Sequence, residues 1–307
     1  MRLALLCPGQ GAQGRAMFEL ARADSAAGAL LDTMIAQAGL DAPVDAVLAD
    51  DTLLFANRHA QPLVVAATLA NWKALERDLP APAIVAGYSI GEVAAYAVAG
   101  ALAPGAAVAL ARVRAGLMDA SLGATPHQAL VPVSGLPLDA IEALVRQHGF
   151  HVAIVTGDDS LIAGGRADRA AGLAAALAAA GARSSLLPVA VASHTPFMAG
   201  AVAPLAAALR QALSDPQVPV LSGISGERIT RRDKAVEHLS RQVAEPVLWR
   251  ECMDALVESG VTVALELGPG AGLSRMLQAR HPGIATRSVA DFRSLDGVRG
   301  WLARQAD

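Results

Sequence analysis

The segment Ala83-Ile84-Val85-Ala86-Gly87-Tyr88-Ser89-Ile90-Gly91 decides how this chain is interpreted. An apolar run leads into the pattern Gly-x-Ser-x-Gly, and an alanine-rich helical pattern over 93–98 follows it. A strand that turns sharply into a helix at this pattern is typical of a nucleophile elbow, in which the serine hydroxyl is exposed at the carboxyl end of the strand. The N–H group of Ile90 would then lie at a helix N-terminus and face a developing oxyanion. An ordinary strand-to-helix turn with a capping serine can have the same sequence pattern, so the pattern alone leaves both interpretations open.

The composition is that of a globular chain with a large core. Of the 307 residues, 53% are hydrophobic and 17% are charged, which excludes a disordered chain. The net charge of -3 gives no sign of a nucleic-acid-binding protein. Two cysteines without a CxxC pattern fit a reducing compartment, so we expect a cytoplasmic protein. The sequence contains no uninterrupted apolar run of about 18 residues, so we expect no membrane span.

Alternating strand and helix patterns predict an α/β protein with a mostly parallel sheet. The first strand covers 3–7 and is followed by a glycine-rich turn over 8–13. A helix over 62–75 has Pro62 at its first position, which suits a helix start. Further elements are a strand over 83–86, helices over 106–120, 204–213 and 251–259, and strands over 218–222 and 262–267.

The middle of the chain has a different order of elements. Its patterns predict a strand over 128–133, a helix over 138–147, strands over 152–155 and 161–163, a helix over 168–180 and a strand over 184–191. This βαββαβ order is the ferredoxin-like pattern. We therefore expect a small ferredoxin-like domain, 125–192, inserted into a large α/β-hydrolase-like domain formed by 1–124 and 193–307.

A serine nucleophile needs a base within hydrogen-bond reach. Of the seven histidines, His194 stands out because it follows the last predicted strand of the insertion, where the chain re-enters the large domain. Domain junctions are where clefts form, although a loop histidine without a catalytic role would fit the same position. No pair of histidines has the spacing of zinc ligands, so we expect no metal site.

Two arginines, Arg112 and Arg114, interrupt the apolar helix over 106–120. Only one of them is expected to point inward, because residues two apart do not share a helix face. A buried arginine needs an anion, which is either a carboxylate of the protein or a ligand. The helical pattern alone leaves both possibilities open.

Several short motifs occur in a fixed order along nearly the whole chain. They are Pro8-Gly9-Gln10-Gly11-Ala12-Gln13, Gly87-Tyr88-Ser89-Ile90-Gly91-Glu92, Arg114 with Met118, Ser193-His194, Gln242 before Pro246-Val247-Leu248-Trp249, and Gly268-Pro269-Gly270. In this order they resemble the malonyl-CoA:acyl carrier protein transacylases, which also have an inserted ferredoxin-like domain. Several ordered motifs are far more specific than any one of them.

The resemblance implies roles for residues of this chain. Ser89 would be the nucleophile and His194 the base, and the side-chain carbonyl of Gln242 would accept a hydrogen bond from the histidine. The main-chain N–H groups of Gln10 and Ile90 would form the oxyanion hole. The substrate would be malonyl-CoA, and the acceptor would be the thiol of a phosphopantetheine-type arm on an acyl carrier protein, with no permanently bound cofactor. Arg114 would pair with the malonyl carboxylate.

Two further features resemble one branch of the family. One is Tyr88, which stands where the family usually has histidine, and the other is the segment Asp291-Phe292-Arg293-Ser294-Leu295-Asp296-Gly297. Both resemble the malonyltransferase (epsilon) subunit of bacterial malonate decarboxylase, which would make the partner the decarboxylase carrier subunit. The alternatives are a transacylase of fatty acid or polyketide synthesis and, more remotely, a serine hydrolase or a non-catalytic docking subunit. The segment 191–193 leaves the size of the α-substituent open.

Overall fold

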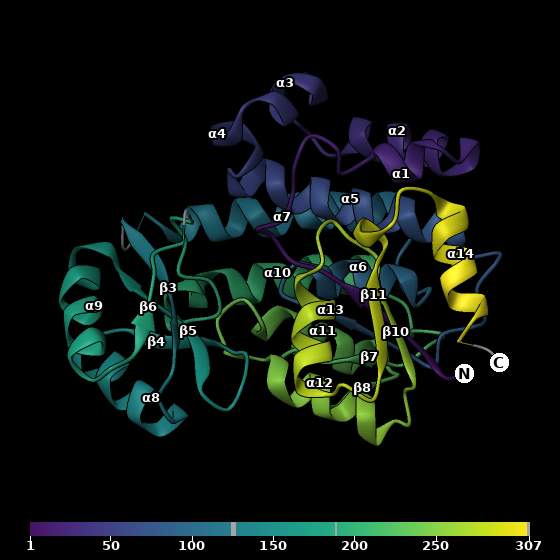
Figure 1. Ribbon diagram of the computed structural model, residues 1–307. Helices are drawn as coiled ribbons and strands as arrows, with labels where there is room; N and C mark the ends of the chain where they lie inside the picture. Colours follow the sequence, from purple (N-terminus) through teal and green to yellow (C-terminus); the bar gives the residue numbers. More distant parts are fainter. Residues whose placement is uncertain (124–126, 188, 306–307) are drawn as a thin grey trace.

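The computed structural model describes residues 1–123, 127–187 and 189–305 and contains two sheets (Figure 1). The main sheet has six strands in the order β11-β10-β1-β2-β7-β8, and all neighbours are parallel except β7 and β8. This confirms the predicted mostly parallel sheet. The strands are β1 (Leu3–Cys7), β2 (Ile84–Gly87), β7 (Val220–Leu221), β8 (Arg228–Ile229), β10 (Val263–Glu266) and β11 (Ala285–Ser288).

The two faces of the main sheet are both covered by helices. Side chains alternate between faces along a strand, so Leu3 and Leu5 join one hydrophobic cluster while Ala4 and Leu6 join another. The first cluster contains residues of α5 (Asn57–Leu75), α6 (Gly91–Val98), α7 (Pro104–Ser121) and α10 (Ala199–Ala212). The second contains residues of α12 (Trp249–Glu258) and α13 (Gly272–Arg280). The sheet is therefore the middle layer of a three-layer α/β arrangement.

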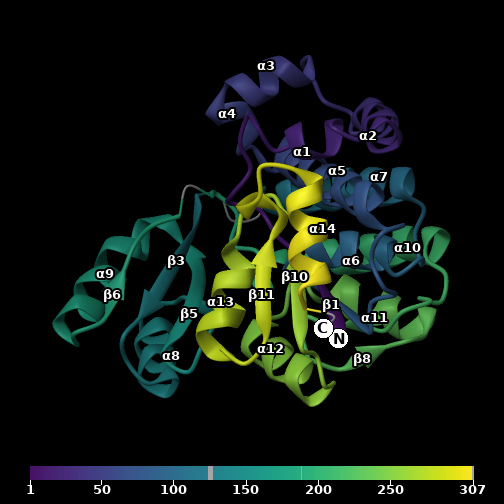
Figure 2. The same ribbon diagram turned by 45° about the vertical axis from the view of Figure 1, so that its right-hand side comes forward.

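The remaining helices extend this core. The segment between β1 and α5 forms α1 (Glu19–Arg22), α2 (Ser25–Gln37), α3 (Val44–Ala49) and α4 (Asp51–Leu54), and α2 packs on α5 and α7. Helix α11 (Arg232–Arg241) packs on α10, and α14 (Leu295–Ala303) packs on α5. Figures 1 and 2 both place the last turn of α14 near the N-terminus. In the part of the chain described here, no helix has both the length and the apolarity to cross a membrane.

The second sheet forms the separate teal lobe in Figures 1 and 2. Its elements are β3 (Gln128–Ser134), α8 (Leu138–Gln147), β4 (His151–Val155), β5 (Ser160–Arg166), α9 (Ala170–Ala179) and β6 (Arg183–Ser184). They confirm the predicted βαββαβ order. A fifth strand, β9 (Val247–Leu248), pairs with β4 in parallel and was not predicted. The domain boundaries stay a prediction, and the first of them falls at 124–126, outside the described residues.

Several predicted element boundaries were wrong. The helix predicted over 204–213 is α10, which begins at Ala199 and has Pro204 inside it. Helix α5 begins at Asn57, and Pro62 lies inside it. The rule that places proline at a helix start concerns only the local backbone, whereas nearly every side chain of α5 from His59 onward is buried by tertiary packing.

The strand predicted over 184–191 is also shorter than expected. Strand β6 covers only Arg183–Ser184. Beyond it Ser185 N–H still donates to the Pro132 carbonyl (3.3 Å), and Leu187 N–H donates to the Leu130 carbonyl (3.0 Å). Pro132 has no N–H group to donate in return, so the ladder of paired hydrogen bonds cannot continue there.

Candidate active site

The turn after β2 has the geometry of a nucleophile elbow. Ser89 has a backbone φ of 55°, in the left-handed region that non-glycine residues rarely adopt. Glycine is required on both sides of it. A Cβ atom at Gly87 would overlap the backbone of Glu92, and one at Gly91 would overlap the carbonyl of Cys7 at the end of β1. The sharp turn therefore depends on the two glycines that first suggested it.

The structure brings Ser89 and His194 together. The Oγ atom of Ser89 lies 2.7 Å from Nε2 of His194, and Nδ1 of the same ring lies 2.6 Å from the main-chain carbonyl oxygen of Gln242. A carbonyl oxygen only accepts hydrogen bonds, so Nδ1 carries the proton and Nε2 is free to accept from the serine hydroxyl. The main-chain N–H of His194 donates to the Val243 carbonyl (2.8 Å), which fixes the loop that holds the ring.

The histidine is neutral in this environment. Its side chain is fully buried. Desolvation by burial, and next the positive charge of Arg114, lower the pKa of His194 to about 3, against a smaller opposing effect of the Gln242 carbonyl. A neutral imidazole that accepts a hydrogen bond from a serine hydroxyl is the arrangement that general-base catalysis needs.

The predicted role of the Gln242 side chain in orienting the histidine was wrong. The acceptor is the main-chain carbonyl of Gln242, which is the C-cap residue directly after α11. The last carbonyl groups of a helix have no partner within the helix, so this one is available to the imidazole. The side chain instead accepts from Arg114 Nη2 (3.2 Å) and donates to the carbonyl of Ser89 (3.2 Å) and to Oε2 of Glu92 (2.5 Å).

Of the two arginines on α7, Arg114 is buried and Arg112 is exposed. Arg114 donates from Nη1 to Gln61 Oε1 (2.8 Å) and from Nη2 to Gln242 Oε1 (3.2 Å), and Nη2 also lies 3.4 Å from Ser89 Oγ. All these partners are neutral. Among the residues that the structure describes, no carboxylate forms an ion pair with Arg114, and its Nε has no hydrogen-bond acceptor. Burial lowers the pKa of Arg114 to about 10, so the group keeps its charge at neutral pH. This leaves the guanidinium available to an anionic ligand.

The first loop of the chain lies beside the elbow. A Cβ atom at Gly9 would be 2.9 Å from the carbonyl oxygen of Tyr88 and 3.7 Å from Cβ of Ser89. Next to it, the main-chain N–H of Gln10 has no acceptor in 1–123, 127–187 or 189–305, and the same holds for the N–H of Ile90. Both N–H groups that we expected to form an oxyanion hole are therefore unengaged.

Two buried polar residues of the site were missed in the sequence. Glu92 is 1% exposed and Gln61 is fully buried. Burial raises the pKa of Glu92 to about 7, partly opposed by hydrogen bonds from the N–H of Gly223 and from Gln242 and by the charge of Arg114. The signal that pointed to Arg114, a charged residue in an apolar helical pattern, was also present at Glu92.

Two hollows are lined by residues of the elbow or of the first loop beside it. One, of about 450 Å³, is lined by Tyr88, by residues of the small sheet and by Met276 of α13. Another, of about 730 Å³, is lined by Gln10, residues 55–58 and residues 189–191. The ring of Tyr88 packs edge-on against Trp249, with 5.4 Å between centroids, so it forms a wall of the first hollow.

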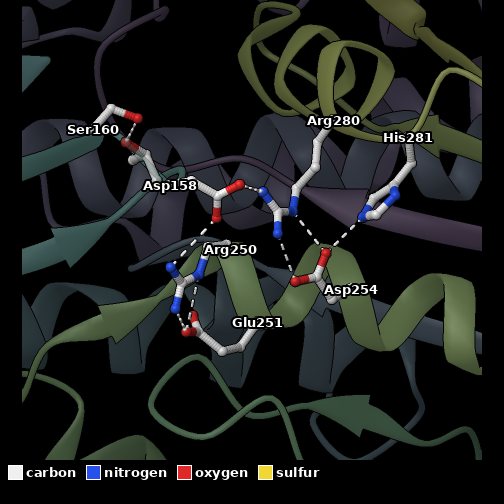
Figure 3. A network of polar contacts seen from close by, with 8 residues as sticks. Asp158, Ser160, Arg250, Glu251, Asp254, Arg280 and His281 are labelled. Carbon is white, nitrogen blue, oxygen red and sulfur yellow. Dashed lines mark hydrogen bonds and ion pairs between the residues drawn. The ribbon is translucent and has the colours of Figure 1, made fainter. Parts of the chain in front are cut away.

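A polar network attaches the small sheet to the main one (Figure 3). Asp158, in the turn between β4 and β5, accepts from Arg250 of α12 (3.4 Å) and from Arg280 of α13 (3.1 Å). Arg280 also forms a bidentate pair with Asp254 at 2.7 and 2.8 Å, which His281 joins at 2.7 Å. These contacts fix the position of the β4–β5 turn, and Thr156 and Ser160, at its two ends, line the first hollow.

The comparisons with known proteins identify the family. The family model described as "Acyl transferase domain" matches residues 4–291. The chain belongs to the acyl transferase family. Its relatives include the malonyl CoA-acyl carrier protein transacylase of Mycobacterium tuberculosis, which is 34% identical over 96% of this chain and 98% of the relative. The enzyme of the same name from Bacillus subtilis is 28% identical, over 96% of this chain and 95% of that enzyme.

Solved structures of this acyl transferase family have the same fold. The malonyl-CoA:acyl carrier protein transacylase of Xanthomonas oryzae superposes with a TM-score of 0.90 at 26% identity and 99% coverage of both chains. The M. tuberculosis protein superposes with a TM-score of 0.88 at 32% identity, over 97% of this chain and 100% of that one. A malonyl-transacylase in complex with a type II polyketide synthase acyl-carrier protein matches with a TM-score of 0.88, at 26% identity and over 98% of this chain and 99% of that one. The predicted fold class is confirmed.

Proposed function

We propose that this acyltransferase moves a malonyl group from CoA to the thiol of an acyl carrier protein through an ester on Ser89. The single observation that carries this proposal is the position of Arg114. Its buried guanidinium lies 3.4 Å from the Oγ atom of Ser89 and forms no ion pair with a carboxylate in the described ranges of the chain. A carboxylate on the acyl group would therefore meet a preformed partner at the reacting atom.

The first half-reaction transfers the acyl group to the enzyme. Nε2 of His194 accepts the hydroxyl proton as Ser89 Oγ attacks the thioester carbonyl, and the Gln242 carbonyl stabilises the imidazolium that forms. The oxyanion is bound by the N–H groups of Gln10 and Ile90. When the tetrahedral intermediate collapses, the C–S bond breaks and His194 returns the proton to the departing CoA thiolate.

The second half-reaction repeats these steps in reverse order. The thiol of the carrier loses its proton to Nε2 of His194 and attacks the ester carbonyl. The C–O bond to Ser89 then breaks, and the serine oxygen recovers the proton. Because CoA leaves before the carrier reacts, the kinetics are ping-pong.

Arg114 supplies the selectivity for malonyl over acetyl groups. A guanidinium offers paired donors that match a carboxylate, and Nε of Arg114 is a buried donor without an acceptor in the described part of the chain. An acetyl group leaves these donors unsatisfied. A serine hydrolase without a charged substrate would have no use for such a group.

The comparisons favour an acyl carrier protein of fatty acid or polyketide synthesis over the decarboxylase carrier subunit. Relatives that match over nearly their whole length carry transacylase names, others are polyketide synthases, and one solved relative is bound to a polyketide acyl-carrier protein. The residues that resemble the decarboxylase subunit have packing roles of their own: Asp291 caps a short helix together with Ser288, and Phe292 packs on Trp301.

Intact-mass spectrometry tests the proposal directly. Incubation with malonyl-CoA should add one malonyl group to the protein, and peptide mapping should place it on Ser89. The Ser89→Ala variant should remain unmodified. A stable adduct on any other residue would refute the assignment of the nucleophile.

A further inference from the structure

Two buried charges beside Ser89 are separated by a single amide group. Glu92 and Arg114 are each 1% exposed. The side chain of Gln242 lies between them, with Oε1 at 3.2 Å from Nη2 of Arg114 and Nε2 at 2.5 Å from Oε2 of Glu92. A carboxylate accepts and a guanidinium donates, so these two neighbours fix the orientation of the amide.

Each charged group keeps one unused atom. Neither Oε1 of Glu92 nor Nε of Arg114 has a hydrogen-bond partner within the described ranges. The other oxygen of Glu92 also accepts from the N–H of Gly223 at 3.0 Å. The carboxylate is thus held by two donors, and neither of them is Arg114.

The charge balance of this cluster depends on Glu92 and Arg114 alone. The titratable groups around Glu92 are Arg114 of α7, Tyr96 of α6 and Cys252 of α12, with the neutral His194 beyond the backbone of Gln242. Burial raises the pKa of Tyr96 and of Cys252, so both stay neutral at physiological pH. When Glu92 is ionised, the empty site has no net charge.

A malonyl group changes this balance. Its carboxylate brings a second negative charge to a site with one guanidinium, in which the side chains of Arg114 and Glu92 are almost fully buried. An uncompensated charge in such surroundings is costly. An ionisable group whose neutral form is accessible near physiological pH, such as the carboxyl group of Glu92, becomes neutral instead. Resting on the function proposed above, we propose that Glu92 is the counter-charge of Arg114 in the empty site and takes up one proton from solvent when a malonyl carboxylate pairs with Arg114.

The direction of the pH dependence follows from the carboxyl group. Burial raises the pKa of Glu92 to about 7, so both forms are populated at neutral pH. Below that pH Glu92 is already protonated, and malonyl binding needs no proton. Above that pH, each further pH unit should weaken malonyl binding by up to about tenfold. This continues until the pH reaches the pKa that Glu92 has when the malonyl group is bound.

The test measures protons on the wild-type protein during a single acylation. In a weakly buffered solution with an indicator dye, excess malonyl-CoA at about pH 8 should cause uptake of close to one proton per Ser89 acylated. At about pH 5.5 the same acylation should take up almost none. Mass spectrometry of the same samples reports how much Ser89 ester has formed.

Two variants identify the group that takes up the proton. Glu92→Gln keeps an oxygen for the Gln242 amide and cannot titrate, so its uptake should vanish and its malonyl KM should become independent of pH. Glu266→Gln is the matched control. Glu266 is fully buried and its pKa is also raised to about 7, but its oxygens accept from the N–H groups of Leu273 and Ser274 at the start of α13. This variant should retain the uptake.

The outcomes separate the inference from the proposed function. Acylation of Ser89 without proton uptake at about pH 8 would overturn the inference and leave the function intact. Uptake that persists in Glu92→Gln, or that is lost in Glu266→Gln, would also overturn it. Failure of malonyl-CoA to acylate Ser89 in the wild type would instead refute the proposed function.

Discussion

Ser89 and His194 are joined by a hydrogen bond of 2.7 Å, and both have a left-handed backbone, with φ values of 55° and 63°. Such conformations cost of order 1–3 kcal/mol for a residue other than glycine, so the surrounding structure must stabilise both. Gly87 and Gly91 permit the turn at Ser89, and the hydrogen bond to Val243 fixes the loop at His194. The reacting pair is therefore positioned before any substrate binds.

The low pKa of His194 predicts an unusual pH profile. Burial and the charge of Arg114 lower that pKa to about 3, so the imidazole remains a base throughout the mildly acidic range. In acetyl transfer, where no substrate carboxylate is involved, kcat/KM should not fall as the pH drops from 7 to about 5. His194→Ala should abolish acylation throughout that range. An acidic limb near the ordinary histidine pKa would contradict the predicted environment of His194.

Replacing Gln242 should have a smaller effect than replacing the histidine. The main-chain carbonyl that orients His194 is still present in Gln242→Ala, and the side-chain hydrogen bonds to Arg114, Glu92 and the Ser89 carbonyl are lost. We expect acetyl transfer to fall by about 10- to 100-fold, because hydrogen bonds to charged groups are lost while the reacting pair keeps its own. Rapid-quench measurement of Ser89 acylation checks this. A loss equal to that of His194→Ala would mean that the side chain orients the imidazole after all.

The sequence predicted the elbow and its partners but not the atoms that join them. Gly87, Ser89 and Gly91 impose a local geometry, so a short motif was sufficient there. His194 and Gln242 are 48 residues apart in the chain, and whether a side chain or a main-chain carbonyl reaches the imidazole depends on where α11 ends in space. The start of α5 was missed for a related reason, because tertiary burial outweighs the local preference of Pro62.

Arg114→Ala should impair malonyl transfer far more than acetyl transfer. The malonyl carboxylate would be left unpaired at a buried site, which costs roughly 2–5 kcal/mol. The measurement is kcat/KM for malonyl-CoA and acetyl-CoA in parallel. Arg112→Ala is the control, because Arg112 lies on the exposed side of the same helix and should affect neither substrate. Equal losses for both substrates in Arg114→Ala would show that Arg114 only supports the packing of the site.

Gly91→Ala should destabilise the fold, whereas Gly116→Ala should not. The new Cβ at position 91 would overlap the carbonyl groups of Cys7 and Pro8, so β1 and α6 would have to separate. We expect a loss of about 1–3 kcal/mol in the free energy of unfolding. Gly116 lies inside α7 with open space around its Cβ position, so alanine there should add about 0.5–1 kcal/mol. Urea denaturation of the wild type and the two variants measures their free energies of unfolding. A Gly91→Ala variant as stable as the wild type would contradict the close approach of β1 and α6.

The identity of the carrier can be decided by comparing the rates of malonyl transfer to two carriers. The relatives are named as transacylases of acyl carrier proteins, so we expect malonyl transfer to a carrier of fatty acid or polyketide synthesis to be faster than transfer to the decarboxylase carrier. By its resemblance to the decarboxylase branch, the second carrier would bear a longer phosphoribosyl-dephospho-CoA arm. Tyr88 lines the hollow next to the elbow and packs on Trp249. Tyr88→His introduces the usual residue of the family there and should leave acylation of Ser89 by malonyl-CoA intact, because no hydrogen bond of the reacting pair involves the tyrosine ring. Steady-state rates with both carriers, measured for the wild type and this variant, provide the test. A wild-type preference for the decarboxylase carrier that is lost in Tyr88→His would assign the chain to the decarboxylase branch and make Tyr88 the residue that recognises the longer arm.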